Sequence, residues 1–246
     1  MGQVVSRRAV GRVLMLVALL LSSAPFAAEV GEPTESVAPW ESFQRLREGN
    51  ERFAAGRSRT SANHVEARRA LLKGQKPHTI LVSCSDSRVP PELVFDQGLG
   101  ELFIVREAGN GLDNVGLASI EFAMEQLGAR LIVVLGHEYC GAVKAALATE
   151  EGASAGSSNL EALVASIHEN MRGTTLTEAD RVDPKAARAS WANVNGVVRR
   201  LLEGSELVRK RVEAGEVVIV PGLYSLETGR VRFWDTDEVG GGAPGP

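Results

Sequence analysis

The sequence has 246 residues, which is enough for one α/β domain with a sizeable hydrophobic core. Its 27 Lys and Arg residues against 31 Asp and Glu residues give a formal net charge of −4. The chain therefore lacks the basic excess that would indicate a nucleic-acid partner. The 2 cysteines, Cys84 and Cys140, allow one disulfide at most in an exported protein, or both can serve as metal ligands.

The first 28 residues have the pattern of a secretory signal peptide. A positive region with Arg7, Arg8 and Arg12 precedes an apolar stretch at 13–21, which is short for a membrane span. Small residues follow, and they place a cleavage site between 24 and 28. We therefore expect a periplasmic or secreted protein without membrane attachment after cleavage. An uncleaved anchor or amphipathic helix is the alternative. The twin-arginine export route is only weakly indicated, because Val10 stands where that motif prefers Phe.

Three further regions follow the signal segment. Residues 29–39 are rich in Pro, Glu, Ser and Thr and lack periodicity, which is typical of a linker. Residues 40–236 hold the alternating apolar patterns of one domain, and the Gly- and Pro-rich tail at 237–246 is predicted to be disordered.

Within the domain, short apolar runs alternate with segments of helical periodicity. Strands are expected at 79–83, 102–105, 131–135, 217–223 and 231–234. Helices are expected at 40–54, 64–72, 115–127, 141–148, 160–171, 184–202 and 205–214, with a helical turn at 90–92, a tight turn at 109–111 and a surface loop at 149–158. This alternation predicts an α/β fold with a mainly parallel central sheet flanked by helices, and the last hairpin adds an antiparallel edge strand near the C-terminus.

Candidate metal ligands follow two of these strands directly. Cys84 comes after the strand at 79–83, while His137 and Cys140 come after the strand at 131–135. If these strands are parallel neighbours, both motifs lie at the carboxyl edge of the sheet, where open α/β sheets place their sites. Two thiolates and one imidazole suit Zn²⁺ and leave a fourth position for water, substrate or Asp86. A disulfide between the cysteines is the competing interpretation.

An acid and a base lie close to the first cysteine. Asp86 and Arg88 are two and four residues beyond Cys84, so an extended chain would place all three on one side. Arg88 could then pair with Asp86 and keep it ionised, and Asp86 could accept the proton of a zinc-bound hydroxide. The alternative is an ordinary surface ion pair.

Four sequence blocks together carry a family resemblance that covers residues 40–235. They are Cys84-x-Asp86-Ser87-Arg88-Val89, Gln97-x-x-Gly100-x-Leu102-Phe103, Arg106-x-Ala108-Gly109-Asn110 and Gly136-His137-x-x-Cys140-Gly141-Ala142-Val143. The chain resembles the β-class carbonic anhydrases. The resemblance implies a lyase (carbonate dehydratase) in which a zinc-bound hydroxide reversibly hydrates CO₂ to bicarbonate and a proton. It also implies that Cys84, His137 and Cys140 hold the zinc, with Asp86 and Arg88 as catalytic residues.

The resemblance further implies a homodimer or homotetramer, with an N-terminal helix that packs across the partner. It assigns substrate-binding roles to Gln75, acting from across a dimer, and to Phe103 and Phe122. From the residues alone, three alternatives stay open. Gln75 can be a plain loop residue, the two aromatic side chains can be core residues, and the helix can cover its own domain.

Two states of the site are known in the resembled family. Asp86 can pair with Arg88, or it can become the fourth zinc ligand in a closed state that accompanies bicarbonate binding. Arg106 and Tyr224 match a possible bicarbonate pocket, but Leu81 stands where that pocket uses a Trp. We therefore predict a weakened pocket and an open site near pH 8.

Other functions remain to be distinguished from CO₂ hydration. Hydrolysis of carbonyl sulfide or carbon disulfide is known from relatives on the same fold, and the ligand set alone cannot separate it. A non-enzymatic zinc-binding protein is disfavoured, because structural sites normally use four protein ligands and need no Asp86–Arg88 pair. Three further histidines are candidate proton carriers, namely His64, His78 and His168.

Overall fold

The computed structural model of the chain describes residues 36–59 and 65–233. The predicted signal peptide, most of the linker, His64 and the C-terminal tail therefore lie outside the described residues. No helix in the described ranges combines the length and the apolar character that a bilayer crossing requires.

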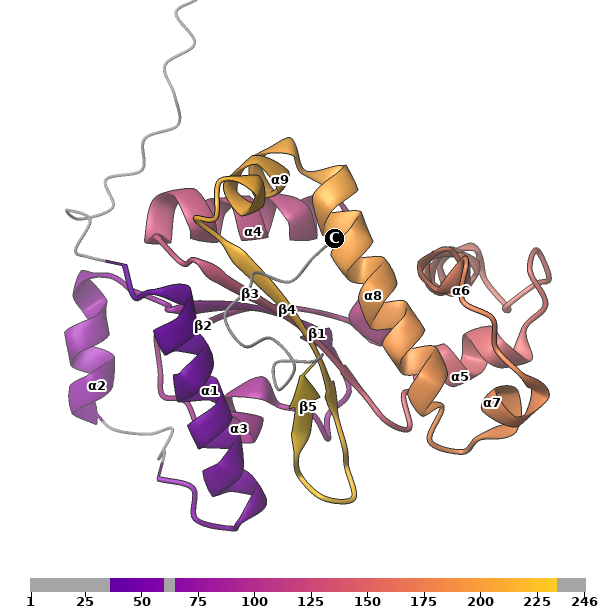
Figure 1. Cartoon of the computed structure of the whole chain (residues 1–246), viewed down its shortest axis with the longest axis horizontal. Helices are drawn as coiled ribbons and strands as arrows, with labels where there is room; N and C mark the ends of the chain where they lie inside the picture. The colour runs from indigo at the N-terminus through magenta and orange to yellow at the C-terminus, as the bar shows by residue number, and fades with distance from the viewer. Residues whose placement is uncertain (1–35, 60–64, 234–246) are drawn as a thin grey trace, which may run out of the picture.

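A five-stranded sheet forms the centre of the domain, in the order β2-β1-β3-β4-β5 (Figure 1). Its strands are β1 (Thr79–Cys84), β2 (Leu102–Glu107), β3 (Leu131–His137), β4 (Val218–Tyr224) and β5 (Val231–Phe233). The first four strands run parallel, and β5 pairs antiparallel with β4 at the edge. The predicted α/β class, the mainly parallel sheet and the antiparallel edge strand are thus confirmed.

Helices cover both faces of this sheet. The α-helices are α1 (Pro39–Ala54), α2 (Val65–Ala70), α3 (Pro91–Val94), α4 (Asn114–Leu127), α5 (Gly141–Ala148), α6 (Ser158–Met171), α7 (Glu178–Val182), α8 (Ala187–Gly204) and α9 (Glu206–Glu213). Two short 3₁₀ helices are η1 (Leu71–Lys73) and η2 (Ala108–Asn110). Gly128 ends α4 in the left-handed conformation at φ 71°, as a glycine at this position predicts.

Two hydrophobic layers hold these helices against the sheet, on opposite faces in Figure 1. On one face, α4, α8 and α9 pack on alternate strand residues such as Ile80 and Val82. On the other face, α1 and α3 pack on the intervening residues, including Leu81 and Val133. Because β1 and β3 are buried on both faces, their sequences are continuous apolar runs rather than alternating ones.

The predicted helix at 184–202 was wrong at its beginning. Pro184 lies in a turn in which the Ala186 N–H donates to the Asp183 carbonyl at 2.9 Å, and Ala186 adopts a left-handed φ of 48°. The α8 helix therefore begins only at Ala187, whose N–H donates to the Asp183 carboxylate.

The short helix α7 was missed altogether. Its signal is a capping box, in which Thr177 and Asp180 each accept the other's backbone N–H. Because α7 spans only five residues, from Glu178 to Val182, it carries too little hydrophobic periodicity to be recognised by that pattern.

Candidate metal centre and active site

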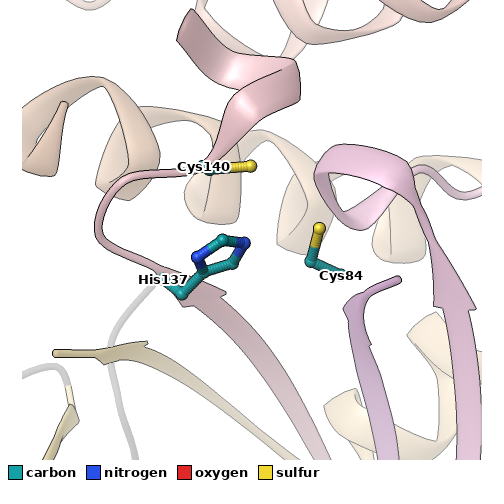
Figure 2. A group of neighbouring side chains, drawn as sticks. All are labelled: Cys84, His137 and Cys140. Atoms are coloured by element: carbon teal, nitrogen blue, oxygen red, sulfur yellow. The ribbon is translucent and has the colours of Figure 1, made fainter. Parts of the chain in front are cut away.

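Three potential metal ligands converge at the carboxyl edge of the sheet. Cys84 ends β1, His137 ends the neighbouring parallel strand β3, and Cys140 directly precedes α5. Their ligand atoms all lie within 4.8 Å of one another, and Figure 2 shows the side chains directed into a common space. The expectation that the two strands are parallel neighbours is confirmed, and it explains why residues 53 positions apart in the chain meet.

The His137 imidazole is oriented for metal binding through one defined nitrogen. Its Nδ1 lies 2.8 Å from the Glu138 carbonyl oxygen, which can only accept, so Nδ1 carries the proton. The other nitrogen, Nε2, is buried and has no hydrogen-bond partner among the described residues. A buried nitrogen with a lone pair and no partner is what a metal ion would satisfy.

Backbone N–H groups lie close to both sulfur atoms. The Gly109 N–H donates to the Cys84 sulfur at 3.3 Å. The hydrogen bond between the two cysteines lowers the pKa of Cys84 and raises the pKa of Cys140. Cys140 also precedes the first turn of α5, and the N–H groups of Ala142 and Val143 stabilise its thiolate form.

The ligand set fits zinc. Both cysteines are free, so the disulfide interpretation finds no support here. Tetrahedral zinc with bonds of about 2.0–2.3 Å sets its ligand atoms roughly 3.5–3.8 Å apart, which is compatible with the compact trio. Three protein ligands leave one tetrahedral position for substrate chemistry.

The Asp86–Arg88 pair lies at the edge of this cluster, although not for the expected reason. The chain after Cys84 is a turn rather than an extended segment, with the Val89 N–H donating to the Asp86 carbonyl at 3.0 Å. The Asp86 carboxylate accepts the Arg88 N–H at 2.9 Å, and this local turn brings the two side chains together.

The pair itself is bidentate. Arg88 Nε and Nη2 donate to the two Asp86 carboxylate oxygens at 2.9 and 2.7 Å. The Arg88 hydrogen bond is the main reason why the pKa of Asp86 falls to about 2, so Asp86 is ionised at neutral pH. Its Oδ2 lies 3.8 Å from His137 Nε2, beside the space between the ligand atoms.

Arg106 holds the loop that carries these groups. Its guanidinium donates to the carbonyl oxygens of Cys84 and Asp86 at 2.9 Å each and to that of Val89 at 3.3 Å. Tyr224 is 5% exposed and packs in the α1–α3 layer together with Leu81. Arg106 and Tyr224 thus lie on strands of the same sheet, but Nε and Nη2 of Arg106 already donate to the backbone.

Sequence reasoning missed a pair of asparagines behind the cluster, of which Asn193 is buried and Asn170 is half-buried. Asn193 of α8 donates to the Gly109 carbonyl at 2.7 Å, and Asn170 of α6 donates to the Asn193 side chain at 2.9 Å. Gly109 adopts a left-handed φ of 62° and donates its own N–H to Cys84. The pair therefore fixes the turn that supports the Cys84 thiolate.

The three residues assigned to substrate binding lie apart from the cluster within one chain. Gln75 is exposed between η1 and β1. Phe103 pairs with Ile80 on the neighbouring strand, which places it about 13 Å along β1 from the level of Cys84. Phe122 lies beside Phe103 at 6.4 Å between ring centroids, and Phe103 packs against the α4–α8–α9 layer.

The described histidines outside the ligand set have structural partners. His78 lies between Thr79 at 2.8 Å and Gln97 at 3.0 Å, and burial lowers its pKa. His168 donates to the Ala146 carbonyl at 2.7 Å. Neither belongs to the cluster of ligand atoms, and His64 lies outside the described residues.

A parallel α/β sheet with two cysteines and a histidine at its carboxyl edge, next to an arginine-bound aspartate, defines a zinc metalloenzyme of the β-carbonic-anhydrase type. A family profile described as carbonic anhydrase matches residues 79–231. The chain belongs to this family.

Relatives and solved structures agree with this assignment. Carbonic anhydrase 2 of Mycobacterium tuberculosis is 39% identical over 202 residues, covering 82% of this chain and 94% of the relative. The carbonic anhydrase of Mycolicibacterium smegmatis is 38% identical, covering 79% of this chain and 93% of the relative. The β-carbonic anhydrase CafA of Aspergillus fumigatus superposes with a TM-score of 0.61 at 26% identity, over 78% of this chain and 90% of that one.

The fold is also shared with a solved structure from a study of two tetrameric β-carbonic anhydrases of Sordaria macrospora, at a TM-score of 0.59 and 20% identity over 79% of this chain and 98% of that one. The chain is therefore a zinc-dependent enzyme that reversibly hydrates CO₂ to bicarbonate and a proton.

Proposed function

We propose that Cys84, His137 and Cys140 hold the zinc ion of this carbonic anhydrase, and that Asp86 and Arg88 are its catalytic residues. The observation that carries the proposal is the buried Nε2 of His137, which has no hydrogen-bond partner within residues 36–59 and 65–233 and lies beside two sulfur atoms and the Asp86 carboxylate. Zinc supplies a Lewis acid at this position and lowers the pKa of a bound water to about 7.

The protein groups around that position have separate roles. An ionised carboxylate only accepts hydrogen bonds, so Asp86 orients an O–H donor beside the ligand atoms. Arg88 keeps Asp86 ionised and fixes both of its oxygens through the bidentate pair. With its hydrogen directed at Asp86, the oxygen of that O–H group can present a lone pair to CO₂.

The test measures turnover and zinc content on the same purified enzyme. CO₂ hydration with about one zinc per chain is expected, whereas carbonyl sulfide and carbon disulfide should be hydrolysed far more slowly. A preference for either sulfur substrate would favour the hydrolase alternative. Activity that persisted after complete zinc removal would contradict the proposed site.

We also propose that the site is open near pH 8, with Asp86 bound to Arg88 rather than to the metal. The bidentate pair and the low pKa of Asp86 support this arrangement. A bicarbonate pocket on Arg106 and Tyr224 should be weak, because Leu81 offers no N–H donor and Arg106 already binds three carbonyl groups. A zinc-loaded crystal structure at pH 8 with Asp86 on the metal, or sigmoidal inhibition by bicarbonate, would contradict the proposal.

We further propose a homodimer, or a homotetramer built from such dimers. Its support is a group of exposed apolar side chains in the N-terminal part of the domain, with no buried residue in α2. They are Trp40 at 60%, Val65 at 48%, Leu72 at 85%, Leu93 at 50% and Leu99 at 44% exposed. In such a dimer a partner copy could supply Gln75 and the Phe103–Phe122 pair to the pocket. Sedimentation should show a dimer or its multiple, and a fully active monomer would contradict the proposal.

Export to the periplasm or the extracellular space is proposed from the sequence of residues 1–28. Mass spectrometry of the exported protein should find a mature N-terminus near 24–28. An intact Met1 in the exported fraction would contradict cleavage.

A further inference from the structure

Tyr139 has an unusual backbone conformation at the rim of the site. It lies between the ligands His137 and Cys140 and adopts a φ of 60°. Left-handed backbone is uncommon for residues other than glycine, and a bulky side chain keeps it only where surrounding contacts impose it. Such a residue at the rim of a catalytic site calls for a physical cause.

Every polar group of Tyr139 is engaged. Its backbone N–H donates to the Lys185 carbonyl at 2.6 Å, and its hydroxyl donates to Glu227 Oε1 at 2.6 Å. Its carbonyl oxygen accepts from Arg88 Nη2 at 3.2 Å. Glu227 in turn accepts from Lys185 Nζ at 2.6 Å through its other oxygen. We call Tyr139, Lys185 and Glu227 the rim junction.

The rim junction joins three segments that are distant in the sequence. Tyr139 belongs to the loop before α5, Lys185 to the turn before α8, and Glu227 to the connection between β4 and β5. The Lys185 ammonium and the Glu227 carboxylate carry opposite charges. The hydrogen bonds from Lys185 and Tyr139 lower the pKa of Glu227 and so favour its charged form. All three segments therefore meet at the one residue whose carbonyl oxygen contacts Arg88.

Arg88 needs such an anchor. Its side chain is 51% exposed, and a long exposed arginine loses rotamer freedom when it is held in one geometry. Apart from Asp86 within its own turn, the Tyr139 carbonyl is the hydrogen-bond partner that the described residues provide for its guanidinium. If the Tyr139 peptide rotated away, only the flexible turn would hold the Arg88–Asp86 pair.

We propose that Tyr139 is a positioning residue for Arg88: the rim junction holds the left-handed backbone of Tyr139, and the Tyr139 carbonyl holds the guanidinium that orients Asp86. This inference rests on the proposed catalytic role of Arg88. It assigns the β4–β5 connection, far from the metal ligands in sequence, a part in keeping the site ready for turnover.

Two variants break the rim junction without touching a ligand or the catalytic pair. Tyr139→Phe removes only the hydroxyl, and Glu227→Ala removes the acceptor of both Tyr139 and Lys185. Each should lower kcat about fivefold with KM unchanged, as expected for one lost hydrogen bond expressed in the transition state. The double variant should be no worse than Glu227→Ala alone, because both changes remove the same bond.

Conservative variants separate positioning from general stability. Glu227→Gln retains an acceptor for the Tyr139 hydroxyl and should restore most of the lost kcat. Tyr139→Gly adopts the same φ without strain but has no side chain to anchor its peptide to Glu227, so its kcat should stay reduced. The control is Glu213→Ala, which breaks an exposed pair with Arg209 on α9 and should leave kcat unchanged.

A readout independent of activity is the exchange of the Arg88 Nε–H proton, followed by NMR in the zinc-loaded enzyme. Exchange should be several-fold faster in Tyr139→Phe and Glu227→Ala, since a bond that holds the guanidinium is weakened. Unchanged exchange and unchanged kcat in both variants would overturn the inference. Arg88→Lys tests the catalytic role of Arg88 separately from the positioning role of Tyr139. If that change costs no activity, the proposed role of Arg88 itself is wrong.

Discussion

The two halves of the site differ in how they are built. The metal-ligand half is buried, with Cys84 4%, His137 0% and Cys140 1% exposed, and each ligand is placed by the end of a strand or the start of a helix. The catalytic half is a turn at the surface, where the side chains of Asp86 and Arg88 are 16% and 51% exposed. Regular structure therefore places the proposed metal ligands, and charge-assisted hydrogen bonds hold the proposed catalytic pair.

This difference predicts two kinds of failure. A change among the buried ligands should remove zinc and weaken the fold, because metal binding energy contributes to folding. A change in the catalytic half should leave the zinc in place and lower turnover, since hydrogen bonds at the surface contribute little to stability.

The largest effect is expected from Cys140→Ser. A hydroxyl is a poor substitute for a thiolate as a zinc ligand, and the α5 N-terminus that stabilises the thiolate would have no anion to bind. We expect loss of most of the zinc and of nearly all CO₂ hydration, measured by metal analysis and stopped-flow assay on one sample. Full zinc occupancy with full activity would rule out Cys140 as a ligand.

The second effect tests the catalytic half alone. Asp86→Asn keeps the size of the side chain but loses the charge that Arg88 binds, so activity should fall about 10²–10³-fold, the range for loss of a positioned electrostatic partner. Zinc content should stay at the native level. If zinc were lost together with activity, Asp86 would belong to the metal-holding half instead.

A third effect tests whether the metal-holding half extends to α8. Asn193→Ala should weaken zinc affinity by about 10–100-fold, as other losses of groups that orient ligands do, because the Gly109 turn would no longer be fixed beneath Cys84. Competition with a chromophoric chelator measures this affinity. The matched control is Asn170→Ala, which removes only the outer bond to Asn193 and should have a smaller effect.

The same contrast decides how much could be predicted from the sequence. The candidate ligands follow short, β-branched apolar runs that are typical of buried strands, so their convergence at one sheet edge was predictable and is confirmed. The sequence predicted that Asp86 and Arg88 pair, but not the conformation of the chain between them. The Asp86 carboxylate accepts the backbone N–H of Arg88 two residues later, and this bond favours a turn over an extended chain.

The hydrogen bonds that support the site from distant parts of the chain have no recognisable pattern in the sequence. Asn193 is 84 residues from Gly109, and Glu227 is 88 residues from Tyr139. A single asparagine in a helix or a glutamate in a hairpin has no periodicity or spacing that reveals its partner. Such contacts follow from how α8 and the β4–β5 connection pack on the sheet, which depends on the whole fold.

The smallest effect concerns acid stability and the Asp86–Arg88 pair. Arg88 lowers the folded-state pKa of Asp86 from 3.8 to about 2, so the pair stabilises the fold at pH values above the unfolded-state pKa. That stabilisation is lost as the pH falls through the folded-state pKa, because protonated Asp86 no longer attracts the guanidinium. Arg88→Gln removes the cause and should return Asp86 towards its usual pKa.

The difference in free energy of unfolding between the native chain and Arg88→Gln should therefore be largest above about pH 4 and shrink towards zero near about pH 2. Urea unfolding of the zinc-free protein at a series of pH values measures it, since zinc release by protonated thiolates would otherwise dominate the acid range. A difference that stayed constant over this range would show that Arg88 does not hold Asp86 ionised. The bidentate pair would then be a surface contact without the orienting role given to it here.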